Sequence, residues 1–199
     1  NRNFNHPLFD PSGGGDLILY QLFLAFVGHP KPHLMLFPLF GLFSHIITHK
    51  RGKTIPFGQL GKIYPKFPLV ILSFSEWAQH LFTVGMYIDT PPYFTSTTMM
   101  IAVPTENKIF SWNATMQGIP PLTSPKMIWG LGFVFSFTSW GWTGVILATS
   151  SPDTLIHDSY YVPSHFHYLL AMGAVLAIMK TMIPWFPLLA GTAMNEEWL

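Results

Sequence analysis

The segment Tyr161–Ala190, YVPSHFHYLLAMGAVLAIMKTMIPWFPLLA, decides the fold of this chain. A helix that crosses a membrane needs about 20 predominantly apolar residues, so this segment predicts a membrane span. His165 and His167 stand near its start. Two positions along a helix correspond to about 200° around its axis. The two imidazoles therefore point to opposite faces, which favours two separate planar cofactors such as haems over one shared metal ion.

The composition of the whole chain agrees with a membrane location. Only 10% of the 199 residues are charged, 49% are hydrophobic, and the mean hydropathy is +0.34. Soluble domains carry about 25% charged residues, so this chain has too few polar residues to cover the surface of a soluble helical domain. We predict an all-α, polytopic membrane helix bundle that forms one unit over residues 1–199. Its five expected spans are 17–43, 67–86, 94–112, 127–149 and 161–190.

Charges in the connecting segments predict an orientation. The first connection carries Lys50, Arg51, Lys53, Lys62 and Lys66, and the third carries Lys126; the second carries Asp89, and the fourth carries Asp153 and Asp158. Positive loops lie on the cytoplasm-like side of a membrane, so the N-terminus is expected on the opposite, acidic side. The chain has no cysteine, which leaves histidine, carboxylate and amide groups as metal ligands.

Polar residues inside the predicted spans point to function, because a charge at the centre of a bilayer costs at least about 2.5–3.5 kcal/mol. A single membrane histidine is more often hydrogen-bonded in the bundle than bound to a metal. The grouping of His29 and His80 with the His165–His167 pair nevertheless favours haem and metal binding. The other polar residues in the spans are Lys31, His33, Glu76, Gln79, Thr98, Thr105, Glu106 and Lys108.

At these residues the chain resembles subunit I, the catalytic subunit of cytochrome c oxidase and other haem–copper oxidases. The matching strings are Phe9–Asp16 (FDPSGGGD), Gly28-His29-Pro30, His80–Met86 (HLFTVGM), Tyr93–Pro104, His157–Val162 (HDSYYV) and His165–Tyr168 (HFHY). The resemblance covers essentially the whole chain. It corresponds to the sixth to tenth helices of a twelve-helix subunit.

The resemblance implies a role for each matching residue. His165 is the expected axial ligand of the high-spin, oxygen-reducing haem, and His167 is an expected ligand of the low-spin haem. His29 and His80 match two of three copper-ligating imidazoles, and Gln79 stands at the third. His157 and Asp158 match a magnesium site, a donor pair that suits a hard or borderline divalent ion. Thr105 and Lys108 match a proton path, and burial makes it easier for a lysine to lose its proton.

Three residues differ from those that the family has at its catalytic positions. Lys31 and His33 stand where the family has a proton-donating glutamate and a tyrosine that takes part in O–O cleavage. Gln79 replaces a histidine, and its amide oxygen is a weak ligand for Cu(I), which prefers imidazole or sulfur. Taken literally, the sequence predicts weak copper binding and slow oxygen reduction. Glu76 could compensate for the charge of Lys31 by forming a predicted buried ion pair with it. Such a pair offsets the cost of desolvating both charges only if its geometry is excellent.

Two explanations of these departures stay open. Each of the three codons is one nucleotide from the codon of the family residue, as expected if the transcript is edited before translation. We prefer editing to a real loss of function, because the haem motifs are intact.

The expected function is therefore electron transfer from cytochrome c, through the low-spin haem, to a haem–copper centre that reduces O2 to water with proton translocation. The alternatives are a haem-binding but catalytically silent paralogue and a relative that reduces nitric oxide. Expected partners are the remaining segments of subunit I, a copper-bearing subunit II, other oxidase subunits, cytochrome c and membrane lipids, with no nucleic acid. The expected location is the mitochondrial inner membrane, with the bacterial plasma membrane as the alternative.

Overall fold

The computed structural model describes residues 3, 6–118, 124–192 and 194–195, and every regular element within them is helical, which confirms the predicted all-α class. The α-helices are α1 (Leu17–Gly28), α2 (Pro30–Lys50), α3 (Gln59–Ile63), α4 (Lys66–Ser75), α5 (Thr90–Met116), α6 (Pro125–Ala148), α7 (Ser150–Ile156), α8 (Tyr161–Phe166) and α9 (Gly173–Ala190). Two 3₁₀ helices, Pro11–Gly13 and Trp77–Leu81, and a π-helix, His167–Met172, complete the order.

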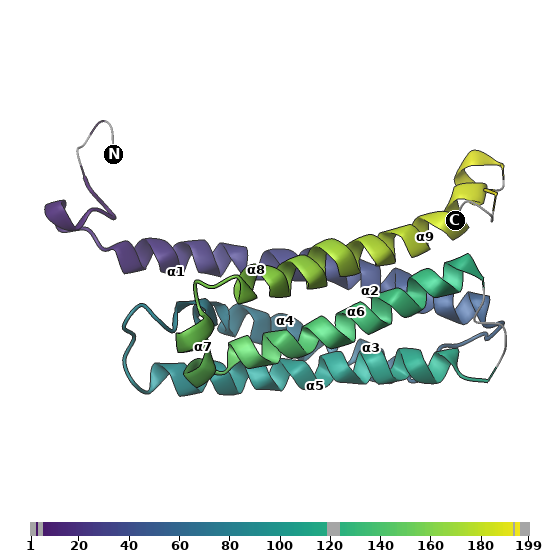
Figure 1. The fold of residues 1–199 in the computed structure, drawn as a ribbon, viewed down its shortest axis with the longest axis horizontal. Coiled ribbons are helices and arrows are strands. Elements are labelled where there is room, and N and C mark those ends of the chain that lie inside the picture. The colour runs from purple at the N-terminus through teal and green to yellow at the C-terminus, as the bar shows by residue number, and fades with distance from the viewer. Residues whose placement is uncertain (1–2, 4–5, 119–123, 193, 196–199) are drawn as a thin grey trace.

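The long helices run side by side along one common direction (Figure 1). The ends of α2, α5 and α9 and the start of α6 gather at one end of the bundle, and the starts of α1 and α5 and all of α7 gather at the other. Lys50 and Arg51 therefore lie at the opposite end from Asp89 and Asp153, as the charge pattern of the loops predicts.

The predicted segment 17–43 is helical but interrupted at His29, where α1 ends and α2 begins. The Asp16 carboxylate caps α1 by accepting a hydrogen bond from the Ile18 amide at 2.8 Å. Pro30 and Pro32 have no amide proton to donate to the turn before them, so the chain restarts as a second helix at this point. His29 lies at this junction and keeps the right-handed helical conformation, and its amide donates a hydrogen bond to the Ala25 carbonyl at 2.9 Å.

The other predicted spans correspond to helices of differing regularity. Segment 67–86 forms α4 and the 3₁₀ helix that ends at Leu81, whereas segment 94–112 lies wholly inside α5. Within the described residues, Met127–Ala148 and Tyr161–Ala190 are long and apolar enough to cross a membrane by length and composition. The latter stretch is formed by α8, the π-helix and α9 in succession.

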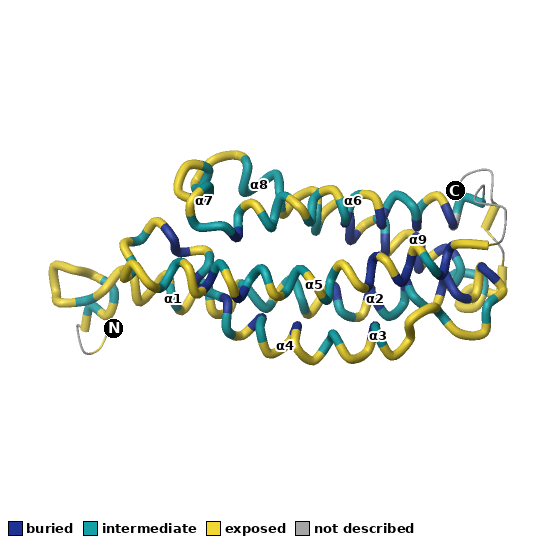
Figure 2. Tube along the Cα trace, turned by 90° about the horizontal axis from the view of Figure 1, so that it is seen from below, coloured by how far each residue is buried: buried dark blue, intermediate teal, exposed yellow. Residues whose placement is uncertain are grey.

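The core lies where α2, α5, α6 and α9 meet, and the outer faces of the bundle stay exposed (Figure 2). At its centre Trp112 of α5, which is 1% exposed, contacts Phe43 of α2 and Phe133 of α6 with ring centroids 4.9 and 5.7 Å apart. The Trp112 indole donates a hydrogen bond to the Ser44 hydroxyl at 2.9 Å, which joins α5 to α2. A buried indole N–H needs such a partner, so this bond fixes the register of the two helices.

Candidate functional site

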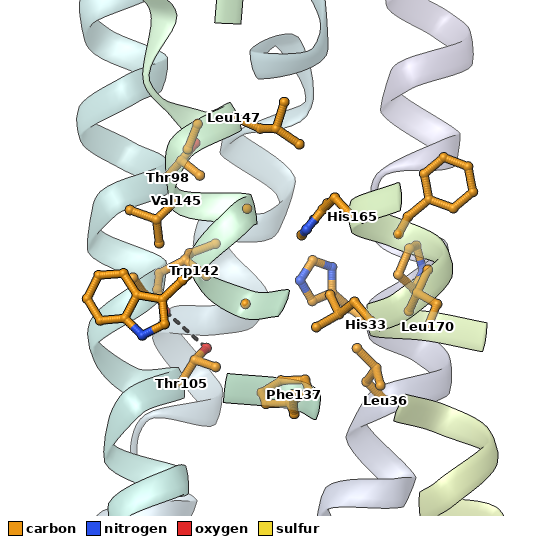
Figure 3. Close-up of a pocket in the computed structure, with 18 of the residues that line it drawn as sticks. His33, Leu36, Thr98, Thr105, Phe137, Trp142, Val145, Leu147, His165 and Leu170 are labelled. Atoms are coloured by element: carbon orange, nitrogen blue, oxygen red, sulfur yellow. Dashed lines mark hydrogen bonds between the residues drawn. The ribbon is translucent and has the colours of Figure 1, made fainter. Parts of the chain in front are cut away.

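A cavity of about 790 Å³ opens between α2, α5, α6 and α8. Apolar side chains such as Leu36 and Phe137 make most of its wall, and polar groups converge on it from several helices. Figure 3 shows the rings of His33 and His165 pointing into the same space. An apolar cavity of this size with a few convergent polar groups is typical of a cofactor or ligand site.

The surroundings of His165 determine which of its ring nitrogens is free. Its Nδ1 lies 3.1 Å from the Trp140 carbonyl oxygen and 2.8 Å from the Thr143 hydroxyl. A carbonyl oxygen only accepts hydrogen bonds, so Nδ1 carries the proton and Nε2 keeps its lone pair. The Trp140 ring also stacks on Tyr168, with centroids 4.0 Å apart and planes 9° apart. The His165 ring is thus oriented by α6 and presents an unprotonated nitrogen, as a metal-ligating imidazole does.

His167 shows the same arrangement on another face. Its Nδ1 lies 2.8 Å from the Pro163 carbonyl oxygen, so Nε2 again keeps the lone pair. The residue lines a separate apolar groove on the outside of the bundle together with Met35, Leu170 and Ile178. The prediction that the two imidazoles face different surroundings is confirmed. The π-helix begins at His167, and such wide turns occur frequently at functional sites.

His29 and His80 come together from segments far apart in the sequence. The Nδ1 atom of His29, at the α1–α2 junction, lies 3.2 Å from Nε2 of His80 in the 3₁₀ helix. His33 follows one turn along α2, with its ring centroid 5.3 Å from that of His29. Its buried Nδ1 has no hydrogen-bond partner among the residues that the structure describes. In the described ranges no three His, Asp or Glu side chains are placed to hold one metal ion.

Comparison with known proteins gives this arrangement a family. The model of the family "Cytochrome C and Quinol oxidase polypeptide I" matches residues 1–199. The chain belongs to this family. It is 45% identical over 197 residues to cytochrome c oxidase subunit 1 of Mytilus edulis, covering 99% of this chain and 36% of that protein. The subunit 1 of Yarrowia lipolytica is 45% identical over 196 residues (98% and 36%), and that of Cereibacter sphaeroides is 44% identical over 195 residues (98% and 34%).

The chain therefore spans about a third of the length of the curated relatives it matches. Membership of the oxidase polypeptide I family places it among polytopic membrane helix bundles, and it corresponds to a fragment of subunit I.

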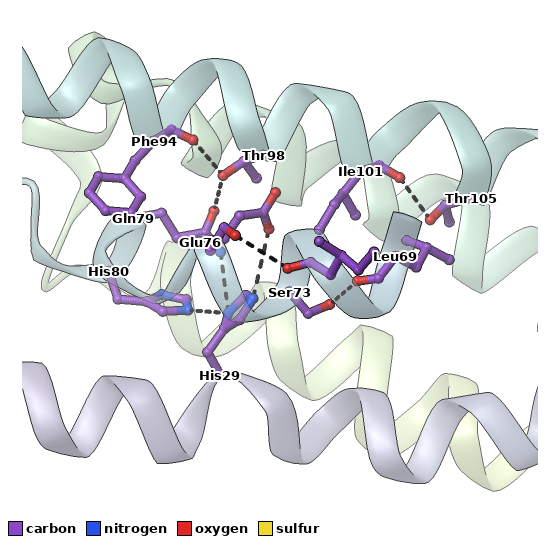
Figure 4. Close-up of polar contacts among 12 residues, drawn as sticks. His29, Leu69, Ser73, Glu76, Gln79, His80, Phe94, Thr98, Ile101 and Thr105 are labelled. Carbon is purple, nitrogen blue, oxygen red and sulfur yellow. Dashed lines mark hydrogen bonds and ion pairs between the residues drawn. The ribbon is translucent and has the colours of Figure 1, made fainter. Parts of the chain in front are cut away.

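Gln79, the expected third copper position of this oxidase polypeptide, has its amide engaged in hydrogen bonds. Its Oε1 lies 2.6 Å from the Thr98 hydroxyl, and its Nε2 lies 3.5 Å from Nδ1 of His29 (Figure 4). The Thr98 proton is shared with the Phe94 carbonyl at 2.8 Å. Copper ligation by Gln79 stays a prediction, and the structure adds a second role, in which the Gln79 amide orients His29.

The predicted ion pair between Lys31 and Glu76 is wrong. Lys31 is exposed on α2, whereas Glu76 is 1% exposed and its Oε2 lies 3.7 Å from Nε2 of His29. His29 keeps the right-handed helical conformation, so His29 and Lys31, two positions apart, lie about 200° apart around the axis. His29 therefore faces Glu76, and Lys31 lies on the outer face (Figure 4).

The predicted magnesium pair has an additional neighbour. The His157 Nδ1 atom lies 3.0 Å from Oδ2 of Asp153, one turn earlier, and its Nε2 lies 3.9 Å from Oδ1 of Asp158. Burial raises the pKa of the Asp153 carboxyl, and the hydrogen bond with His157 opposes that shift. Asp153 orients His157 so that Nε2 faces Asp158. The i, i+4 spacing of Asp153 and His157 was a readable signal for this contact, which our sequence analysis missed.

The two proton-path candidates lie at different depths. Thr105 lines the cavity and donates a hydrogen bond to the Ile101 carbonyl at 3.2 Å. Lys108 is 2% exposed, and its amine lies 4.7 Å from the ring centroid of Phe40 and 5.5 Å from that of Phe37, with no hydrogen-bond partner in the described chain. The two phenylalanine rings thus hold the Lys108 amine beside the cavity and outside its lining.

Proposed function

We propose that this chain is the central part of the catalytic subunit of a terminal respiratory oxidase. The carrying observation is the shared geometry of His165 and His167, each of which donates its Nδ1 proton to a main-chain carbonyl and turns an unprotonated Nε2 to a different apolar surface. Two such imidazoles on one helical stretch fit two haems. His165 would hold the high-spin haem in the cavity, and His167 would hold the low-spin haem in the outer groove.

The residues around His29 fit copper in part. The facing nitrogens of His29 and His80 supply two imidazoles, a donor type that suits copper, whereas the Gln79 oxygen is occupied by Thr98. When bound, the haems and copper supply electron transfer from cytochrome c and the reduction of O2 to water. His157 and Asp158 would hold magnesium at the acidic end of the bundle.

The side chains of this chain perform the remaining tasks. The apolar lining of the cavity excludes bulk water from the reacting space, and Thr105 places a hydroxyl at its wall. Lys108 is the candidate proton carrier toward the cavity, because no described residue accepts a hydrogen bond from its buried amine. Lys31 is exposed, and His33 occupies the cavity in place of the expected tyrosine, which makes these two positions the weakest match to oxidase chemistry.

The proposal extends to partners and location. Because the chain covers about a third of its relatives, the remaining segments of subunit I complete the bundle, and the copper-bearing subunit II and other subunits join it. The donor is cytochrome c, and lipids cover the outer faces. Relatives from a mollusc and a yeast favour the mitochondrial inner membrane, while the relative from Cereibacter sphaeroides keeps the bacterial membrane as the alternative.

The test is an optical and kinetic study of the membrane complex that contains this chain. We expect a high-spin haem that binds CO, a low-spin haem that does not, and oxygen consumption with reduced cytochrome c. A complex with low-spin haem alone and no oxygen turnover would instead identify a catalytically silent paralogue, and turnover of nitric oxide would identify a different reductase.

A further inference from the structure

A buried carboxylate of unexplained purpose lies behind the copper-ligand candidates. Glu76 follows the last residue of α4, is 1% exposed, and lines the cavity together with His29. Its Oε1 has no hydrogen-bond partner within the described residues, and its Oε2 lies 3.7 Å from Nε2 of His29. Burying a carboxyl group without a hydrogen-bond partner is costly, so the contact between Glu76 and His29 matters for the stability of the site.

The opposite edge of the His29 ring determines where the proton of the imidazole sits. Nδ1 faces Nε2 of His80 at 3.2 Å and the amide nitrogen of Gln79 at 3.5 Å. The Gln79 amide is oriented by Thr98, whose hydroxyl donates to Oε1. An amide nitrogen only donates, so Nδ1 of His29 keeps its lone pair and Nε2 carries the proton. That N–H is directed toward the Glu76 carboxylate (Figure 4).

We propose that Glu76 is a positioning residue for His29, holding the imidazole in the tautomer whose Nδ1 lone pair faces His80 and copper. The inference rests on the proposed oxidase function. Metal-ligating histidines almost always give their second N–H to a carboxylate, a carbonyl or water, which fixes the tautomer and makes the ligand more basic. At 3.7 Å the contact is electrostatic and longer than a hydrogen bond. In a buried site a carboxyl oxygen at this distance still favours the tautomer whose N–H faces it.

The proposal also explains how a carboxyl group comes to lie beside the metal-ligand candidates although Lys31 replaces the expected glutamate. Lys31, where the resemblance leads one to expect a carboxylate, is exposed on α2, so Glu76 places a carboxylate beside the metal ligands from α4 instead. Glu106 lines the same cavity but is exposed, and no contact joins it to a histidine among the described residues. Glu106 is therefore a matched control with the same functional group in the same cavity.

The test measures copper retention in the intact oxidase complex carrying variants of this subunit. Copper per haem is followed during dialysis against the Cu(I) chelator bathocuproine. Removing the outer-shell partner of a metal ligand typically weakens metal affinity 10- to 100-fold. Glu76→Leu should therefore release its copper about 10- to 100-fold faster than the unaltered complex, which holds one such copper per two haems. Glu76→Gln keeps the shape and an acceptor oxygen, so its rate should fall between the two. Glu106→Gln should leave the rate unchanged.

Copper loss from Glu76→Gln and Glu76→Leu at the unaltered rate would overturn the positioning role while leaving the oxidase function standing. A complex that contains both haems but no copper beside the high-spin haem, before any substitution, would overturn both. If Glu76→Leu does not assemble, the nearly isosteric Glu76→Gln decides: faster copper loss supports the proposal, and the unaltered rate rejects it.

Discussion

His165 of α8 and Gly144 of α6 are in close contact: a Cβ atom added at Gly144 would lie 2.7 Å from Cε1 of the imidazole. Glycine at this position lets the haem-ligand candidate lie directly against the neighbouring helix, within reach of the Trp140 carbonyl.

Gly144→Ala should therefore displace the His165 ring. Overpacking of this kind costs about 1–3 kcal/mol, which corresponds to roughly 10- to 100-fold weaker binding of the high-spin haem. The CO-difference spectrum of the complex measures that haem. Gly41→Ala in α2 is the control, since no described atom lies within 4 Å of a Cβ at position 41 and Gly41 does not line the cavity. Equal CO binding by the two variants would contradict the close contact.

Lys53 caps the end of α5. Its amine donates to the carbonyls of Thr115 at 2.9 Å and Gln117 at 3.1 Å, groups that a helix terminus leaves unsatisfied. Lys53→Met should lower the free energy of unfolding by about 1–3 kcal/mol. Unfolding of the solubilised complex by SDS, followed by loss of the haem absorption, measures the change. Lys50→Met, at an exposed position, should change little; a similar loss in both variants would mean that general charge is responsible, and not the cap.

Lys180 is fully buried between α9, α6 and α2, and its amine lies 4.1 Å from the Phe43 ring centroid without a hydrogen-bond partner in the described part of the chain. An unsatisfied buried donor costs about 1–3 kcal/mol, more when charged, and the contact with the ring offsets about 0.5–2 kcal/mol. Lys180→Met keeps the volume and removes the charge, so it should raise the stability by about 1 kcal/mol in the same SDS titration. A clear loss of stability would show that the amine has a partner outside this chain.

Asp153 should matter for divalent-metal binding through its contact with His157. Asp153→Ala removes the acceptor of the His157 Nδ1 proton, and such losses weaken metal affinity about 10- to 100-fold. Electron paramagnetic resonance of complex loaded with Mn²⁺ in place of Mg²⁺ measures the affinity. Asp89→Ala, which alters an exposed aspartate at the same end of the bundle, should leave the signal intact. An unchanged Mn²⁺ signal in Asp153→Ala would remove Asp153 from the magnesium site.

The identities at positions 31, 33 and 79 can be read directly by tandem mass spectrometry of the purified chain. We expect Glu, Tyr and His there, as transcript editing predicts, because His33 faces the cavity and Gln79 faces His29 while the haem-ligand geometry around them is intact. Finding Lys, His and Gln would mean that the site is rewritten, and the catalytically silent alternative would then lead.

Local features of the sequence were sufficient for the helical class and for the prediction that His165 and His167 point to different faces. Membrane helices are specified by runs of apolar residues, and the angle between positions i and i+2 follows from the helix itself. The grouping of His29 and His80 as metal-binding candidates followed from their polar character inside apolar segments, whereas their assignment to copper came from the resemblance to a family.

The partners of these side chains were decided by the tertiary structure. Glu76 was expected beside Lys31, yet the packing of α4 against α2 places Glu76 beside His29, while Lys31 lies on the outer face. No sequence pattern indicates that the Trp140 carbonyl would accept the His165 proton, or that Gly144 would make room for the ring. Such contacts join segments more than 20 positions apart, and they depend on how whole helices pack, because a side chain's partner is selected by the position and rotation of the neighbouring helix.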